Sequence, residues 1–183
     1  MTRTLMLACL LALFVPGGAV RGQNSEITSA YDAAKKQTTV RLATAPISGA
    51  QGKYHSLKFS LFYSYAGETS RVPEILTLQL LTVVKTRLLD PDLYVVFTVD
   101  GEEIFLSSNR SAVMKPVPGK NWIGERLDFR LPYETFLKFA GAKQITAKFD
   151  GVPFNFTGDN LRSIREFGRK IKELDQKAVS RSH

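Results

Sequence analysis

The sequence is poor in the residues that bind metals and form disulfides. Its single cysteine is Cys9, and its two histidines are His55 and the final residue His183. One cysteine cannot form a disulfide within the chain, and His55 has no H-x-H or H-E-x-x-H partner. Zinc sites need three or four protein ligands, mostly Cys and His. We therefore expect no metal, no cofactor and no structural disulfide.

Catalytic motifs are also absent. The sequence contains no G-x-S-x-G, S-x-x-K, G-x-x-x-x-G-K-[ST] or G-x-G-x-x-G. Asp90 and Asp92 flank Pro91 without the frame of a calcium loop, so we interpret them as turn residues. These absences predict a protein that is not an enzyme. An enzyme whose site is assembled from distant residues is the third alternative.

No apolar run is long enough to span a membrane, and the longest one lies at the start. Arg3 precedes the 11 apolar residues Leu5–Val15, and Pro16-Gly17-Gly18 ends the run. This is the pattern of a secretory signal peptide rather than of a spanning helix, which needs about 20 residues. We predict a signal peptide over residues 1–22, cleaved after Gly22 in preference to Ala19. An uncleaved anchor and a lipid anchor at Cys9 are the alternatives. The predicted location is the bacterial periplasm or the cell exterior.

From residue 23 onward the main signal is the alternation of apolar and polar residues, which indicates β-strands. "HSLKFSLFYSY", "EILTLQLLTVV" and "ERLDFRL" each place bulky residues on one face, and Asp128 then faces away from the core. Asp100-Gly101 and Asp150-Gly151 each separate two strand-like runs, which is typical of hairpins with type I′ turns. Residues 26–36 fit a strand or a helix, and we favour a strand.

Two helices are predicted. Pro132 suits the first position of a short bridging helix, and Gly141 suits the position just past its end. The second helix covers residues 159–175, and we expect its basic face to be solvated and its apolar face to form a lid over the core. That apolar face comprises Leu161, Ile164, Phe167, Ile171 and Leu174.

These elements predict a mainly β fold in one domain over residues 23–176, followed by a disordered tail at 177–183. The preferred architecture is an antiparallel two-sheet β-sandwich with the short bridging helix and the C-terminal amphipathic helix packed on it. An open barrel is the alternative. The segment "LDFRLPYETFLKFAGAKQITAKFDGVPFNFTGDNLRSIREF" resembles the C-terminal half of small exported bacterial proteins of uncharacterised function. The resemblance implies export and a β-rich fold, and it carries no site residues.

Function is constrained mainly by charge and by one loop. The net charge is +8, which suits anionic partners. Trp122 lies in a Pro/Gly-rich loop with Lys115 and Lys120, and these three residues are the candidate ligand-binding residues. We expect a non-catalytic exported module with a structural or binding role. The alternative is a binding domain for anionic or carbohydrate envelope polymers. Another exported protein is a further candidate partner, whereas a nucleic acid is not expected.

Export can be tested directly. We predict that protein recovered from a secreting bacterial host has lost about 19–22 residues from its N-terminus, because a signal peptidase removes such segments. Intact mass and N-terminal sequencing measure the loss. A full-length species that stays in the membrane fraction would contradict the prediction.

Overall fold

The computed structural model describes residues 26–47, 54–68, 71–85, 94–113, 122–149 and 151–180. The predicted signal peptide, the Asp90–Asp92 turn, Lys115, Lys120 and residues 181–183 lie outside the described residues. The strands are β1 (Ile27–Asp32), β2 (Gln37–Pro46), β3 (Tyr54–Ala66), β4 (Ile75–Val84), β5 (Tyr94–Val99), β6 (Glu102–Val113), β7 (Ile123–Pro132), β8 (Ile145–Phe149) and β9 (Val152–Asn155). The helices are α1 (Tyr133–Gly141) and α2 (Gly158–Ser180).

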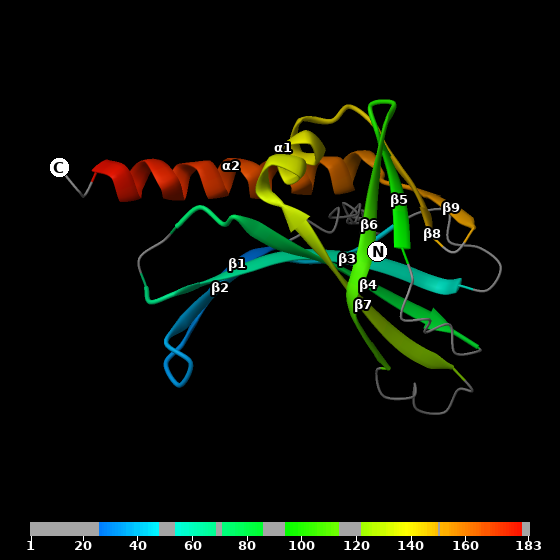
Figure 1. Cartoon of the computed structure of the whole chain (residues 1–183), viewed down its shortest axis with the longest axis horizontal. Coiled ribbons are helices and arrows are strands. Elements are labelled where there is room, and N and C mark those ends of the chain that lie inside the picture. The colour runs from blue at the N-terminus through cyan, green and yellow to red at the C-terminus, as the bar shows by residue number, and fades with distance from the viewer. Residues whose placement is uncertain are drawn as a thin grey trace, which may run out of the picture.

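The nine strands form one antiparallel sheet in the order β1-β2-β3-β4-β7-β6-β5-β8-β9. Strand β6 connects the two parts of the sheet, because its first half pairs with β5 and its second half with β7. Residues 102–107 pair with β5, and the later residues 108–113 pair with β7. Figure 1 shows β5, β6 and β8 rising steeply at one side of the sheet, whereas β3 at the other side of β4 and β7 runs across the view, so the sheet is strongly curved.

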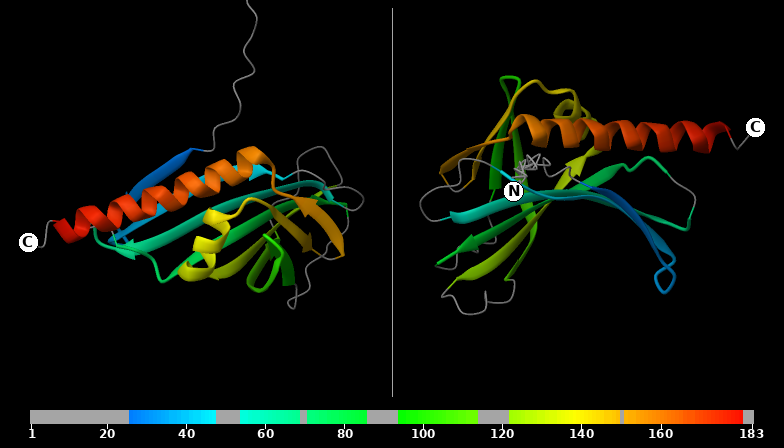
Figure 2. Two further views of the ribbon diagram at one scale, coloured as in Figure 1. Left: turned by 90° about the horizontal axis from the view of Figure 1, so that it is seen from above. Right: turned by 180° about the vertical axis from the view of Figure 1, so that it is seen from behind.

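The mainly β fold is confirmed, but the two-sheet sandwich is not, because all nine strands belong to one open sheet. The layer that covers the inner, concave face consists of the two helices. Figure 2 shows α2 lying lengthwise over the strands with α1 beside it. Alternation along a strand shows that one face is buried but not what covers it, so the sequence pattern did not distinguish a second sheet from a pair of helices.

The hairpins form where the sequence predicts them. Asp100 and Gly101 have φ values of 48° and 93°, the two positive angles that a type I′ turn requires. Strands β8 and β9 pair around Gly151, whose φ is 76°. Strand β1 pairs with β2, which confirms the strand interpretation for its residues.

The Asp100 turn also holds the segment that follows α1. Its carboxylate accepts hydrogen bonds from the backbone N–H groups of Lys143, at 3.0 Å, and Gln144, at 2.9 Å. These two donors, Gln144 first, lower the pKa of Asp100 below its ordinary value, because they favour the charged carboxylate. The β5–β6 hairpin and the loop before β8 are thereby joined.

The ends of α1 differ from the prediction. Pro132 is the residue before the helix, with φ −55° and ψ 143°, rather than its first member. Gly141 is the last helical residue, and Ala142 continues in extended backbone with φ −65° and ψ 144°. The helix therefore ends without the left-handed glycine that the sequence suggested.

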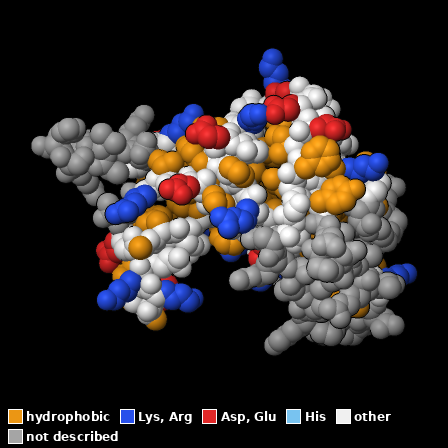
Figure 3. Space-filling view, viewed as in Figure 1, with side chains coloured by type: hydrophobic (Ala, Val, Ile, Leu, Met, Phe, Trp, Pro, Cys, Tyr) orange, Lys and Arg blue, Asp and Glu red, His pale blue; other side chains and the backbone are white. Residues whose placement is uncertain are grey.

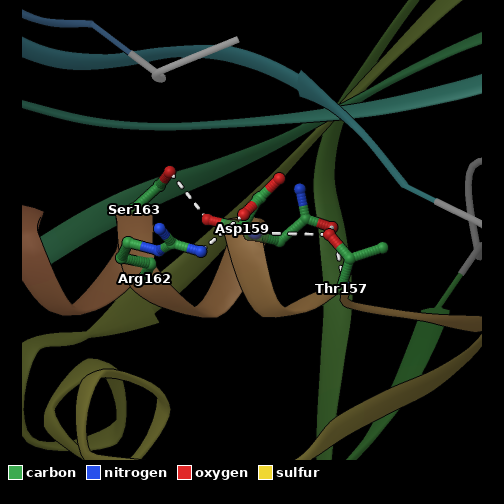
Figure 4. A network of polar contacts seen from close by, with 5 residues as sticks. Thr157, Asp159, Arg162 and Ser163 are labelled. Carbon is green, nitrogen blue, oxygen red and sulfur yellow. Dashed lines mark hydrogen bonds and ion pairs between the residues drawn. The ribbon is translucent and has the colours of Figure 1, made fainter. Parts of the chain in front are cut away.

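Helix α2 begins with a reciprocal cap (Figure 4). The Asn160 Oδ1 atom accepts from the Thr157 N–H at 2.9 Å, and the Asn160 N–H donates to Thr157 Oγ1 at 3.4 Å. Asn160 also donates through Nδ2 to the Pro46 carbonyl at 3.0 Å, which ties the helix start to the end of β2. On the solvent side Arg162 pairs with Asp159 at 2.7 Å.

The far end of α2 extends further than predicted. The helix continues to Ser180, so residues 177–180 are helical where a disordered tail was expected. No glycine or proline follows Gly168 in this segment to end the helix earlier.

The apolar face of α2 closes the core, as predicted for a lid. Leu161, Ile164, Phe167 and Ile171 are buried, whereas Leu174 is only half-buried. The Phe167 ring lies 6.2 Å from that of Tyr63 on β3 and 5.9 Å from that of Phe136 on α1. Gly168 permits a close approach to α1, not to the sheet: a Cβ atom there would lie 2.9 Å from the Cβ atom of Ala140.

The lid can be tested with matched variants. Phe167→Ala should lower the free energy of unfolding by about 3 kcal/mol or more, because it leaves a cavity among fully buried aromatic rings. The double variant Arg162→Ala and Arg169→Ala removes only exposed charges of the same helix and should change the free energy of unfolding by less than about 1 kcal/mol. Chemical denaturation measures both values, and equal losses would show that the charges hold the helix as much as the core does.

Candidate functional site

The loop residues predicted from the sequence are only partly within the described structure. Trp122 is half-buried immediately before β7, and the Lys85 Nζ atom lies 5.7 Å from the centroid of its ring. Lys115 and Lys120 fall outside the described residues, so their predicted association with Trp122 stays a prediction. Lys85, which directly follows β4, was missed because the two residues are far apart in the sequence.

A second set of polar residues lies on the outer face of the sheet, opposite the helices. Side chains on a strand alternate between faces, so the residues between the buried apolar positions point outward. In the register Ser60 of β3 lies opposite Gln79 of β4, and Gln79 lies opposite Asp128 of β7. We call the following five residues the outer-face row: Arg41, Ser60, Gln79, Asp128 and Arg126.

Four members of the outer-face row are joined by hydrogen bonds, and the fifth, Arg126, by an ion pair. Arg41 Nη1 donates to Ser60 Oγ at 3.1 Å and reaches Gln79 Oε1 at 3.5 Å. Gln79 Nε2 donates to Asp128 Oδ1 at 2.9 Å, and Arg126 Nε lies 3.6 Å from Asp128 Oδ2. Each side chain is therefore oriented by the next one, and two guanidinium groups stand at the ends of the row.

The centre of the row is buried although it lies on the outer face. Ser60 is 0% exposed, Gln79 7% and Asp128 8%. The sequence prediction that Asp128 points away from the apolar core is confirmed, although this residue is hardly exposed to solvent. Buried polar groups of this kind must be hydrogen-bonded, and Gln79 meets that need through both ends of its amide.

Arg41 is further fixed by an aromatic ring. Its guanidinium carbon lies 4.4 Å from the centroid of Phe62, the residue opposite it on β3. A guanidinium over an aromatic face is held by a cation–π interaction that leaves its donors free in the plane. Arg41 is thus a pre-oriented cation on the outer face.

Basic side chains outnumber acidic ones around the row. The described outward-facing residues of β2, β3, β4 and β7 include one acid, Asp128. Arg41, Lys58, Arg126 and Arg130 are the basic residues on the same surface. The outer face therefore carries a net positive charge. The sequence did not predict this surface, because its four cations come from three separate strands.

The basic stripe of α2 is more nearly balanced. Arg169 pairs with both Glu166 and Glu173 of the same helix. Arg165 donates to the carbonyl of Ala142 at the end of α1. Figure 3 shows acidic and basic side chains interleaved over α2. Several of the charged side chains of α2 are thus paired within the protein.

The side chains on the outer face are suited to recognising a ligand. Guanidinium groups match the geometry of carboxylates and phosphates, and amide groups add neutral hydrogen bonds. In the described part of the chain no group of three or more His, Cys, Asp or Glu side chains could hold a metal ion. None of the described helices is both long and apolar enough to cross a membrane.

Comparison with protein families, with curated proteins and with solved structures finds no match for this chain.

The hydrogen bonds of the outer-face row should contribute to the free energy of unfolding. Asp128→Ala should lower the free energy of unfolding by about 1–3 kcal/mol, because the buried Gln79 amide would lose its acceptor. Arg130→Ala, an exposed residue two positions along the same strand, should change it by less than about 0.5 kcal/mol. Denaturant titration of both variants measures the difference, and an Asp128 variant as stable as the Arg130 variant would show that the row is not coupled.

Proposed function

We propose that the protein is an exported, non-catalytic binding module that holds an anionic envelope polymer on the outer face of β2, β3, β4 and β7. The observation that carries the proposal is the charge of this face, where four basic side chains surround a single buried acid. The start of the sequence, with the pattern of a signal peptide, supports a place outside the cytoplasm.

The order within the row favours binding over a purely structural role. Arg41 is positioned by Ser60, Gln79 and the ring of Phe62, so little side-chain entropy is lost when it takes a ligand. Arg126 is anchored at the other end by Asp128. Exposed Lys58 and Arg130 add charge that is free to follow a flexible polymer. A repeating carboxylate or phosphate polymer can meet several of these groups together.

The main alternative is a carbohydrate or anionic ligand at Trp122. A half-buried indole ring with a lysine close to it is a small platform for a sugar ring or a partner side chain. This site offers one described cation, whereas the outer face offers four, so the outer face is the stronger candidate for a polyanion.

The proposal predicts a charge-dependent interaction. The protein should bind polygalacturonate and polyphosphate, and the affinity should fall steeply as salt is raised, because the contacts are between exposed charges. Lys58→Glu together with Arg130→Glu should weaken binding roughly tenfold or more, since each cation near an anionic surface contributes about 1 kcal/mol. Isothermal titration calorimetry at several salt concentrations measures both effects.

The matched control places the same charge change elsewhere. Lys170→Glu together with Lys172→Glu alters exposed residues of α2 and should leave binding within about twofold of the wild type, apart from long-range screening effects. Circular dichroism checks that both double variants fold. Equal loss of affinity in the two would mean that net charge alone governs binding, and that the outer face is not the site.

A further inference from the structure

The two edges of the sheet differ in how well they are protected. Strand β9 is four residues long and contains Pro153, which cannot donate a backbone hydrogen bond. Strand β1 has six residues, and four of these are exposed. It contains no proline or lysine, the residues that commonly protect an open edge. Within the described part of the chain, β1 pairs only with β2.

The backbone groups that β1 leaves open can be identified. The Glu26 carbonyl accepts from the Ala43 N–H at 2.8 Å, so this pair is hydrogen-bonded. Hydrogen-bonded pairs alternate along an antiparallel ladder, so the backbone groups of residues 28, 30 and 32 also point toward β2. The N–H and C=O groups of Ile27, Ser29 and Tyr31 therefore point away from the sheet.

We propose that β1 is a dimer interface, where it pairs antiparallel with β1 of a second copy of this chain about a twofold axis midway between the two Ser29 residues. In this register Ser29 lies opposite Ser29 of the second copy, and Ile27 lies opposite Tyr31. All three residues with outward backbone groups are then in hydrogen-bonded pairs, each of which exchanges two bonds.

The side chains fit the same register. Tyr31 is a large apolar residue that is 44% exposed at this edge, and Ile27 is partly buried against the core. Opposed to each other, they form an aromatic and β-branched pair, which is favourable across strands. On the outer face Thr28 lies opposite Ala30, so neither clash nor charge opposes the pairing.

The one unfavourable contact lies at the ends. Glu26 comes opposite Asp32 of the second copy, and like charges across strands are destabilising. Asp32 is already paired with Lys35 of its own turn, at 3.1 Å, which reduces the repulsion. Because the interface is narrow, we place it among weak ones, with a dissociation constant of roughly 10–100 µM.

The dimer would join the two outer faces into one surface. Both copies contribute to a single sheet, so their basic faces point to the same side and one polymer can contact both. This consequence depends on the proposed function, whereas the pairing itself does not.

Sedimentation of the full chain over a range from about 1 to 500 µM tests the pairing, since it covers a weak interface on both sides. We expect a monomer–dimer equilibrium. Ser29→Pro should raise the dissociation constant at least tenfold with an unchanged melting temperature, because proline removes only an outward N–H. Tyr31→Lys, which keeps the backbone intact, should also weaken the dimer at least tenfold and covers the case in which the proline variant misfolds.

A cysteine at the proposed axis tests the register. In a Cys9→Ser background, Ser29→Cys should form a disulfide-linked dimer on mild oxidation, since the two Cα atoms would lie about 5.5 Å apart. Ser107→Cys, at an exposed serine on β6, should form no disulfide-linked dimer under the same conditions. A wild-type chain that sediments as a monomer throughout, or a dimer that Ser29→Pro leaves intact, would overturn the proposal. A monomer that still binds polyanion through the outer face would overturn the dimer alone.

Discussion

The burial of the inner face of one curved sheet is the interaction on which the rest of the structure depends. A single antiparallel sheet has two faces. When one face is apolar it must be covered, and only the other face can be exposed to water. In this protein α2 covers the inner face, with Phe167 fully buried among rings from β3 and α1. Because the helices occupy that side, the outer face is free to carry polar and charged groups.

The division between the faces explains the position of the candidate site. The residues of the outer-face row sit between buried apolar positions of the same strands, so the core fixes the backbone that positions them. Gln79 and Asp128 are buried and hydrogen-bonded to each other, whereas Lys58 and Arg130 are exposed. An oriented centre with exposed charge around it is the arrangement on which the proposed binding of a polymer depends.

Much of the local structure could be predicted from the sequence, because it depends on neighbours in the chain. The Asp100-Gly101 turn, the strand faces and the buried stripe of α2 follow from turn chemistry and from periods of two and 3.6 residues. The features that could not be predicted depend on residues far apart in the sequence. Whether a second sheet or a helix pair covers the strands, and which cations meet Gln79 and Asp128, is decided by the strand order. Alternation alone does not determine that order.

The position of α2 in the chain has a consequence for the order of folding. It comes after all nine strands, and its Asn160 is bonded to the Pro46 carbonyl, 114 residues earlier. A nascent chain therefore exposes the inner face of its strands until this late segment arrives and docks. Long-range closure of this kind is slow and leaves the chain incompletely folded for longer. Under the export proposed above, such a delay would keep the nine strands open for translocation until α2 is available to dock.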